Sequence, residues 1–128
     1  VISSQMRIFK EKYTKDDFTF IINASPEDYV LLMSNASCLV GNSSSFIREG
    51  SQLGKPALLL GNRQNKREVG KNVIYCDYNP LNIMKKIQHQ IIKKKYKNQN
   101  IYGKGVSGKF IVKVLEKINP SIKEQITF

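Results

Sequence analysis

Residues 38–68 read CLVGNSSSFIREGSQLGKPALLLGNRQNKRE, and this stretch decides the fold. The runs SCLVG and KPALLLG are predicted to be buried strands, and the glycine that ends each run opens a polar loop. Between the two runs, residues 44–54 have helical character and end at Gly54, as glycine commonly ends a helix. The order strand, loop, helix, strand predicts two parallel strands joined by a crossover helix.

The same alternation extends to both sides of this stretch. β-branched and aromatic runs predict further strands at residues 17–23 and 71–77. Apolar residues at helical intervals predict helices over residues 1–13, 25–36, 81–96 and 107–118. Strands that alternate with helices in this way predict an α/β fold with a parallel sheet flanked by helices.

The ends of the predicted helices carry their own signals. Ser25 is a predicted N-cap, and Pro26 follows it at the first helical position. Ser107 is the predicted cap of the last helix, which Asn119 and Pro120 are predicted to end. The remaining acids near these ends are interpreted as turn and capping residues: Asp16, Asp17, Glu27 and Asp28.

The composition fits one modest domain with a basic surface. The chain has 128 residues and a formal net charge of +11, from 21 Lys and Arg against 10 Asp and Glu. A surplus of this size can bind nucleic acid, a membrane surface or acidic ligands. Many of the lysines lie in the run IIKKKYKNQN and in the outer helices, so a solvated lysine surface is favoured over a nucleic-acid site.

The chain start and the cysteines indicate where the protein works. The first residue is Val1 and not Met, which leads us to expect processing or a longer parent protein. No apolar run approaches the roughly 18 residues of a membrane span, and no signal-peptide pattern opens the chain. Cys38 and Cys76 lie in apolar runs without a CxxC or Cys/His pairing, which favours free thiols, no zinc site and a cytoplasmic location.

The loop at residues 41–49 suits either an anion ligand or an ordinary helix cap. Gly41 allows a tight turn after the strand, and Asn42 or Ser43 can cap the following helix. The loop's hydroxyls and backbone N–H groups could hold a phosphate or diphosphate, and Glu49 could accept two hydrogen bonds from a ribose diol. The hydroxyls belong to Ser43, Ser44 and Ser45. Residue chemistry alone leaves both interpretations open.

A second polar loop, residues 61–68, follows the next strand. It carries Arg63, Lys66 and Arg67, and arginine holds phosphate through paired hydrogen bonds. Taken alone, the loop also fits an ordinary solvated surface. Because parallel strands end at one edge of a sheet, the two loops are predicted to lie together there, which favours a phosphate site.

Two further features point away from catalysis. GKGVSGKF, residues 103–110, matches the start of a phosphate-binding P-loop, but Phe110 stands where that motif needs Ser or Thr. No convincing strand precedes it, so we interpret it as a turn into a helix. His89 is the only histidine and lies in a lysine-rich amphipathic helix, where a surface position is expected. The sequence shows no catalytic acid and base, no metal ligands and no cofactor motif.

The residues resemble a known family at this point. The segments CLVGNSSSFIREGSQLGKPALLLGNRQNKRE, NVIYCDYN and NIYGKGVSGKFIVKVL resemble the C-terminal part of UDP-N-acetylglucosamine 2-epimerases. GNSSSFIRE and GNRQNKRE resemble the hydrolysing branch. The non-hydrolysing branch typically has an Asp-Ser-Gly-Gly loop with Gln-Glu-Glu and a Thr-Glu-Arg-Pro-Glu loop, and neither occurs in this sequence.

The resemblance implies a fold and a set of ligand contacts. The family has the GT-B fold, so residues 1–128 would form a Rossmann-like C-terminal domain whose N-terminal partner domain is absent from this chain. Ser43 and Ser44 match serines that hold the diphosphate, and Glu49 matches the glutamate that grips the ribose. Arg63 and Arg67 match loop arginines near the phosphates, and Tyr29 matches an aromatic residue beside the uracil. Phe46 stands where the family often has Gly, which leads us to expect crowding near the sugar.

The resemblance also implies a reaction. The family eliminates UDP from UDP-N-acetylglucosamine to give a 2-acetamidoglucal, then adds water to give N-acetylmannosamine for the synthesis of sialic acid or related sugars. Its acid and base carboxylates lie in the N-terminal domain, so this chain alone is predicted to be inactive. No cofactor is implied, and the full-length enzymes suggest a homo-oligomer.

Two other functions remain open. A GT-B glycosyltransferase would share the cleft and the nucleotide but would transfer the sugar to an acceptor. A basic nucleic-acid-binding module would bind DNA with a steep salt dependence and without competition by UDP. The sequence also leaves open uridine or guanosine as the nucleoside, and which 2-acetamido sugar is attached.

Overall fold

The structure, a computed structural model, describes residues 2–13 and 18–118. The chain divides into two compact units, Val1–Leu32 and Met33–Phe128, and each is described by itself. The first unit contains helix α1 (Ile2–Lys12) and most of α2 (Pro26–Asn35). The second unit contains the sheet and the remaining helices, so the predicted nucleotide loops belong to it.

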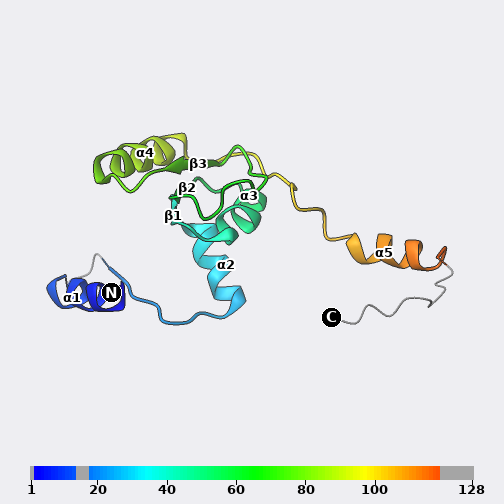
Figure 1. The fold of residues 1–128 in the computed structure, drawn as a ribbon, viewed down its shortest axis with the longest axis horizontal. Coiled ribbons are helices and arrows are strands. Elements are labelled where there is room, and N and C mark those ends of the chain that lie inside the picture. Colours follow the sequence, from blue (N-terminus) through cyan, green and yellow to red (C-terminus); the bar gives the residue numbers. More distant parts are fainter. Residues whose placement is uncertain (1, 14–17, 119–128) are drawn as a thin grey trace, which may run out of the picture. The chain divides into compact units, whose positions relative to one another are not determined.

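The second unit is built on a parallel sheet (Figure 1). Its strands are β1 (Leu39–Gly41), β2 (Ala57–Leu60) and β3 (Val73–Cys76), in the order β1-β2-β3. Leu39 lies opposite Ala57, and Ala57 lies opposite Val73. With helices packed beside the strands, this sheet confirms the predicted Rossmann-like α/β fold.

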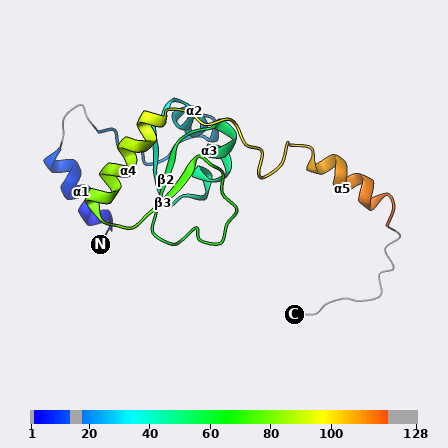
Figure 2. The same cartoon turned by 90° about the horizontal axis from the view of Figure 1, so that it is seen from above.

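Helices lie on both sides of the strands (Figure 2). A 3₁₀ helix η1 (Ser44–Phe46) and helix α3 (Arg48–Leu53) connect β1 to β2. Helix α4 (Pro80–Lys93) follows β3 and packs against β2 and β3. Helix α5 (Ser107–Leu115) comes last.

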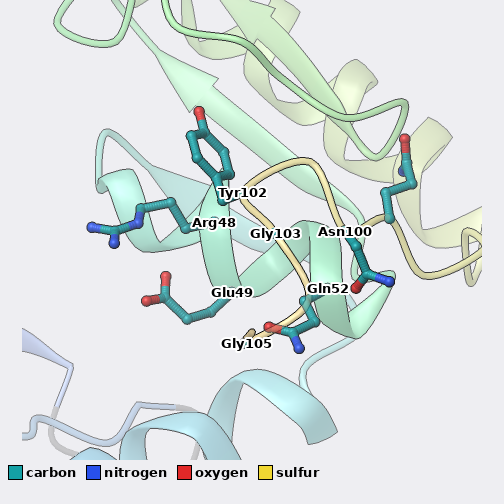
Figure 3. Close-up of a pocket in the computed structure, with 8 residues that line it drawn as sticks. Arg48, Glu49, Gln52, Asn100, Tyr102, Gly103 and Gly105 are labelled. Carbon is teal, nitrogen blue, oxygen red and sulfur yellow. The ribbon is translucent and has the colours of Figure 1, made fainter. Parts of the chain in front are cut away.

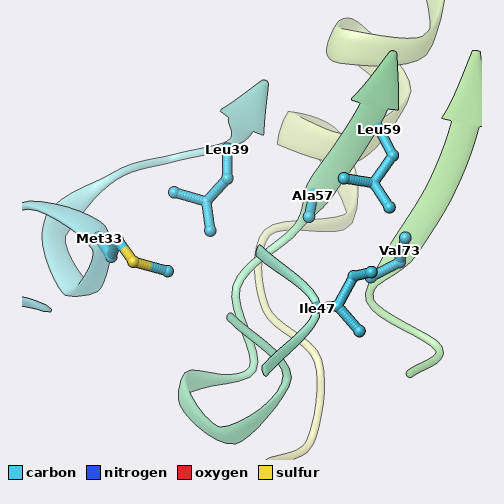
Figure 4. Packing of buried hydrophobic residues seen from close by; sticks show 6 residues of the cluster. All are labelled: Met33, Leu39, Ile47, Ala57, Leu59 and Val73. Atoms are coloured by element: carbon cyan, nitrogen blue, oxygen red, sulfur yellow. The ribbon is translucent and has the colours of Figure 1, made fainter. Parts of the chain in front are cut away.

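The core of this unit forms between α3 and the sheet. Alternate residues of a strand point to opposite faces, so Ala57 and Leu59 face one side and Leu58 faces the other. Ala57 and Leu59 join a buried cluster whose other members come from α2, β1, β3 and the start of α3, namely Met33, Leu39, Val73 and Ile47 (Figure 4). Burial of these apolar side chains is the main stabilising term for the loops that they carry.

A buried polar network fixes the segment that follows α4. Asn72 accepts a hydrogen bond from Ser51 Oγ at 2.9 Å, and Gln90 Nε2 donates to the carbonyls of Ala57 and Asn72, both at 2.9 Å. Tyr96 OH donates to Gln90 Oε1 at 2.6 Å, and Tyr96 N donates to the carbonyl of Gly54 at 3.0 Å. Buried polar groups need such partners, and the network holds residues 94–99 against the end of α3.

The predicted strand at residues 17–23 is wrong for the part that the structure describes. Residues 18–23 contain no strand, and Phe18, Ile21 and Ile22 are exposed. A strand needs a partner for its backbone hydrogen bonds. The aromatic side chains of this segment pack instead on Phe9 of α1, with ring centroids 5.0 Å from Phe18 and 6.3 Å from Phe20.

Most predicted helix ends are close to those observed. Ser25 caps α2 as predicted, because Asp28 N donates to Ser25 Oγ at 3.1 Å. Gly54 ends α3 with φ 63°, again as predicted. The predicted helix over residues 44–54 is two helices, and the one after Asn79 ends at Lys93 because Lys94 has φ 62°. Ser107 is not a cap: Val106 holds that position without a side-chain bond. Predictions for Asp16, Asp17, Asn119 and Pro120 fall outside the described residues.

Candidate functional site

The serine loop, residues 41–45, starts where β1 ends. Gly41 has φ 151°, and a Cβ there would lie 3.2 Å from Phe46 Cε2. The ring of Phe46 therefore packs against the turn and the edge of the core. A side chain at position 41 would disturb this contact, so the glycine is required by a close approach as well as by its backbone angle.

Ser43 caps the helix that follows the loop. Ser45 N donates to Ser43 Oγ at 3.3 Å, and the hydroxyls of these two serines lie 2.6 Å apart. Ser43, Ser44 and Ser45 are half-buried. The structure thus confirms the predicted cap, and a cap and an anion site can use the same hydroxyls and amides, so both interpretations of the loop remain compatible with it.

Glu49 is the most unusual acid near this loop. It lies in the first turn of α3, and its Oε2 atom is buried without a hydrogen-bond partner among the described residues. Arg48 beside it is exposed and makes no ion pair with it in that part of the chain. Glu49 is therefore not part of a solvated ion pair with Arg48. A buried carboxylate oxygen without a partner is costly, and such an atom commonly marks a place where a ligand supplies the donor.

A cavity of about 230 Å³ opens beside Glu49 (Figure 3). One wall is α3, with Arg48, Glu49 and Gln52, and the other is the segment 99–105 that crosses it. The lining residues of this second wall are Gln99, Asn100, Tyr102, Gly103 and Gly105. The cavity is smaller than the roughly 300–1,000 Å³ of most ligand pockets. It therefore fits part of a ligand, such as a sugar ring, better than a whole nucleotide.

The second wall is held in place by hydrogen bonds. Gln99 N donates to the carbonyl of Ser51 at 2.9 Å, and Gln99 Oε1 accepts from Lys71 N at 3.0 Å. Tyr102 OH donates to the carbonyl of Glu68 at 2.6 Å. The wall is thus tied to α3 and to the end of the second loop. Sequence analysis identified only a turn in this region, although the amides of NQN before the two glycines were a signal.

The arginine loop, residues 61–68, lies beside the serine loop as predicted. Gln64 Nε2 donates to the carbonyl of Asn42 at 2.8 Å, which joins the two loops at the carboxyl edge of β1 and β2. Arg63 and Arg67 are exposed, and neither lines the cavity beside Glu49. The loop therefore brings positive charge to this edge without filling the cavity.

A second, shallower hollow of about 430 Å³ lies at the end of β3. Two of its charged groups already have partners: Lys86 Nζ donates to the carbonyl of Tyr75 at 2.6 Å, and Asp77 accepts from Asn79 N at 3.2 Å. The hydrogen bond from Asn79 lowers the pKa of Asp77, so this acid stays ionised as a turn residue. Among the described residues that line this hollow, no buried side-chain polar atom lacks a partner, whereas Glu49 Oε2 lacks one beside the other cavity.

The remaining predicted residues are Tyr29, His89 and the loop at residues 103–110. Tyr29 belongs to the first unit and lines an apolar hollow of about 340 Å³ with Ile21, Ile22, Asn23, Ala24 and Leu32. His89 is exposed on α4, which confirms the predicted surface position. Residues 103–110 form a turn and the start of α5, and no strand occurs in the preceding residues 94–102, as predicted.

Metal ligands and membrane-spanning helices are two further kinds of feature. Within residues 2–13 and 18–118, no three His, Cys, Asp or Glu side chains cluster as they do around a metal ion. No helix in the same part of the chain is long and apolar enough to cross a membrane.

Comparison with known proteins identifies relatives that contain this region. A sequence profile described as UDP-N-acetylglucosamine 2-epimerase matches residues 3–116. The chain is 32% identical over 108 residues to a UDP-N-acetylglucosamine 2-epimerase of Neisseria meningitidis serogroup B. It is 28% identical over 111 residues to a UDP-N,N'-diacetylbacillosamine 2-epimerase (hydrolyzing) of Legionella pneumophila. The matches cover 84% and 87% of this chain but 29% of each relative.

The chain therefore spans less than a third of the length of the curated relatives that it matches. The matched segment contains the serine loop, the arginine loop and both walls of the cavity. A match that covers most of the chain, together with the Rossmann-like sheet, fixes the family. The chain belongs to the UDP-N-acetylglucosamine 2-epimerase family.

Proposed function

We propose that this chain is the C-terminal, UDP-binding domain of a hydrolysing 2-epimerase with a GT-B fold. The whole enzyme would convert UDP-N-acetylglucosamine, or a related 2-acetamido sugar nucleotide, and water into the 2-epimeric free sugar and UDP. The observation that carries the proposal is the buried, unpartnered Oε2 of Glu49 in the wall of a sugar-sized cavity. The serine loop that precedes it supports the hydrolysing branch, as does the name of the relative in Legionella pneumophila.

Glu49 has the chemistry to bind a ribose. An ionised carboxylate only accepts hydrogen bonds, and the two neighbouring hydroxyls of a ribose supply two donors. Leaving a buried acceptor unpaired costs about 1–3 kcal/mol, and more when the group is charged. A ribose in the cavity would remove this cost, with the amides of Gln52 and Asn100 on the walls as additional polar contacts.

The serine loop has the chemistry to hold the diphosphate. Ser43, Ser44 and Ser45 offer hydroxyls and backbone amides at the end of β1, about one helical turn before Glu49. Arg63 and Arg67 in the neighbouring loop can add charge-assisted hydrogen bonds. Tyr29, at the position where the family has an aromatic residue, is proposed to flank the uracil.

These groups would act on the leaving group of the reaction. When UDP departs, negative charge develops on the diphosphate, and donors already in place stabilise that charge. The proton transfers would need acids and bases that the family carries in its N-terminal domain. This chain alone is therefore proposed to bind UDP and to produce no free sugar.

Calorimetric titration with UDP tests the proposal. UDP is expected to bind to the 128-residue chain, and Glu49→Ala is expected to weaken it roughly 10- to 100-fold through the loss of charge-assisted hydrogen bonds. Glu116→Ala, which removes an exposed acid after α5, is the matched control and should leave the affinity unchanged. Equal affinity in both variants would contradict the proposal, as would release of free sugar from UDP-N-acetylglucosamine by this chain.

A further inference from the structure

Gln64 is a buried amide in the middle of an exposed loop. Its side chain is 4% exposed, whereas Arg63, Asn65 and Lys66 beside it are all exposed. Loops at the edge of a sheet normally keep polar side chains in water. A glutamine that turns inward from such a loop therefore needs a reason in the interior.

The contacts of Gln64 supply that reason. Its Nε2 donates to the carbonyl of Asn42 at 2.8 Å, and its own carbonyl accepts from Tyr75 OH at 3.3 Å. The residue thus connects the loop after β1, the loop after β2 and strand β3. The orientation of the amide follows from chemistry, because an amide oxygen in place of Nε2 would face the carbonyl oxygen of Asn42.

The oxygen of the Gln64 amide lowers the stability of the folded chain at this position. Gln64 Oε1 is buried, and no donor reaches it in the described part of the chain. Methionine has a similar length and no such acceptor, so an apolar residue would suit this site better if packing were its purpose. Local rules of stability are commonly broken at functional sites, and the bond to Asn42 is what the amide gains.

We propose that Gln64 is a positioning residue that holds the serine loop in the geometry needed for a diphosphate. Asn42 directly precedes Ser43, so a bond to its carbonyl fixes the peptide from which the serine cap begins. Gln64 itself does not touch the nucleotide. The proposal rests on the function proposed above, and it assigns Gln64 to the diphosphate end while Glu49 serves the ribose end.

The division between the two ends gives a specific test. Gln64→Met keeps the length of the side chain and removes the donor to Asn42. We expect UDP affinity to fall about 5- to 15-fold, uridine affinity to stay unchanged, and thermal stability to stay equal or to rise. NMR titration measures both ligands, because it follows weak binding, and Asn65→Ala is the matched control in the same loop.

A second variant adds the pH dependence of UDP affinity, which a purely structural role of Gln64 would not change. Gln64→Glu places a carboxylate against the carbonyl of Asn42, and burial raises the pKa of such a group. Only its protonated form can donate to Asn42. Relative to the wild type, UDP affinity of this variant should therefore recover between about pH 8 and about pH 5, and uridine affinity should not follow the same course.

The outcomes separate this proposal from the function that it rests on. If UDP binds to the wild type and Gln64→Met leaves UDP affinity unchanged, or weakens UDP and uridine equally, Gln64 is not a positioning residue and the proposed function stands. Gln64 is likewise not a positioning residue if the backbone amide signals of residues 42–45 in ligand-free Gln64→Met are the same as in the wild type. If the wild type binds neither UDP nor uridine, both proposals are wrong.

Discussion

The serine loop at residues 41–45 and the glycine loop at residues 103–110 make an instructive pair. Both begin with glycine, carry serine and lead into a helix, and the second is the better match to a phosphate-binding motif. The serine loop follows a buried parallel strand, its serine makes a cap, and Gln64 ties it to the next loop. The glycine loop follows no strand, and Val106 begins its helix without a side-chain cap.

The difference shows that the strand before a loop determines the position of the loop more than the sequence motif within it does. A parallel strand aims the loop at the ligand edge of the sheet and fixes its first residue. Without that support, the glycine loop contributes backbone to one wall of the cavity, through Gly103 and Gly105. Changes in the two loops and in the helices that follow them should therefore differ in effect, most for glycine, less for serine and least for Phe110.

Glycine replacement should separate α3, which follows the serine loop, from α5, which begins in the glycine loop. Gly54 ends α3 with φ 63°, and a Cβ there would collide with the carbonyl of Tyr96, so Gly54→Ala should lower the free energy of unfolding by about 2–4 kcal/mol. Gly108 lies inside α5 with open space around it, so Gly108→Ala should raise that free energy by about 0.5–1 kcal/mol. Urea unfolding of both variants measures the difference, and equal effects would contradict the comparison.

Serine replacement should give a smaller contrast. Ser43→Ala removes the cap bond to Ser45 N and should cost about 1 kcal/mol of stability. It should also weaken UDP binding, since the same hydroxyl is proposed to contact the diphosphate. Ser107→Ala removes no cap bond and should stay within about 0.5 kcal/mol of the wild type. Thermal unfolding measures the stability of both variants, and titration measures their UDP affinity. A larger loss of stability or of UDP affinity in Ser107→Ala than in Ser43→Ala would contradict the comparison.

Completing the P-loop motif in the glycine loop should have almost no effect on nucleotide binding. Phe110→Ser gives the chain a full match to the P-loop pattern, but Phe110 is exposed on α5 and no strand supports the loop. We therefore expect no binding of ATP with magnesium and unchanged UDP affinity. Calorimetry with both nucleotides measures this, and a gain of ATP binding would show that the motif alone is sufficient.

The sequence predicted those parts of the fold that depend on local signals. Gly54 marked the end of α3 and Ser25 marked the start of α2, because left-handed glycines and serine caps act within a few residues. The prediction of a strand was wrong for residues 18–23, because a strand depends on a partner that local sequence does not specify. Ser107 failed as a cap because the helix begins from Val106.

The residues of the candidate site also divide into those that local sequence signals reveal and those that they do not. Glu49 lies in the wall of the cavity, and a carboxylate one turn after a serine loop is a local pattern that sequence can reveal. Its contact with a ribose stays a prediction. Gln64 and Asn100 were missed, because Gln64 contacts Asn42, 22 residues away, and Asn100 belongs to the wall of a cavity. Such contacts exist only after the sheet and the segment after α4 have packed.

The most direct test of the serine loop as the UDP site is an NMR map of UDP binding on the 128-residue chain. Our account predicts that UDP shifts the backbone amide signals of residues 43–45, of Glu49 and of residues 99–105, and that those of residues 108–115 in α5 stay in place. Shifts confined to α5 or to the lysine-rich end of α4 would contradict it. The absence of any shift at saturating UDP would contradict it as well.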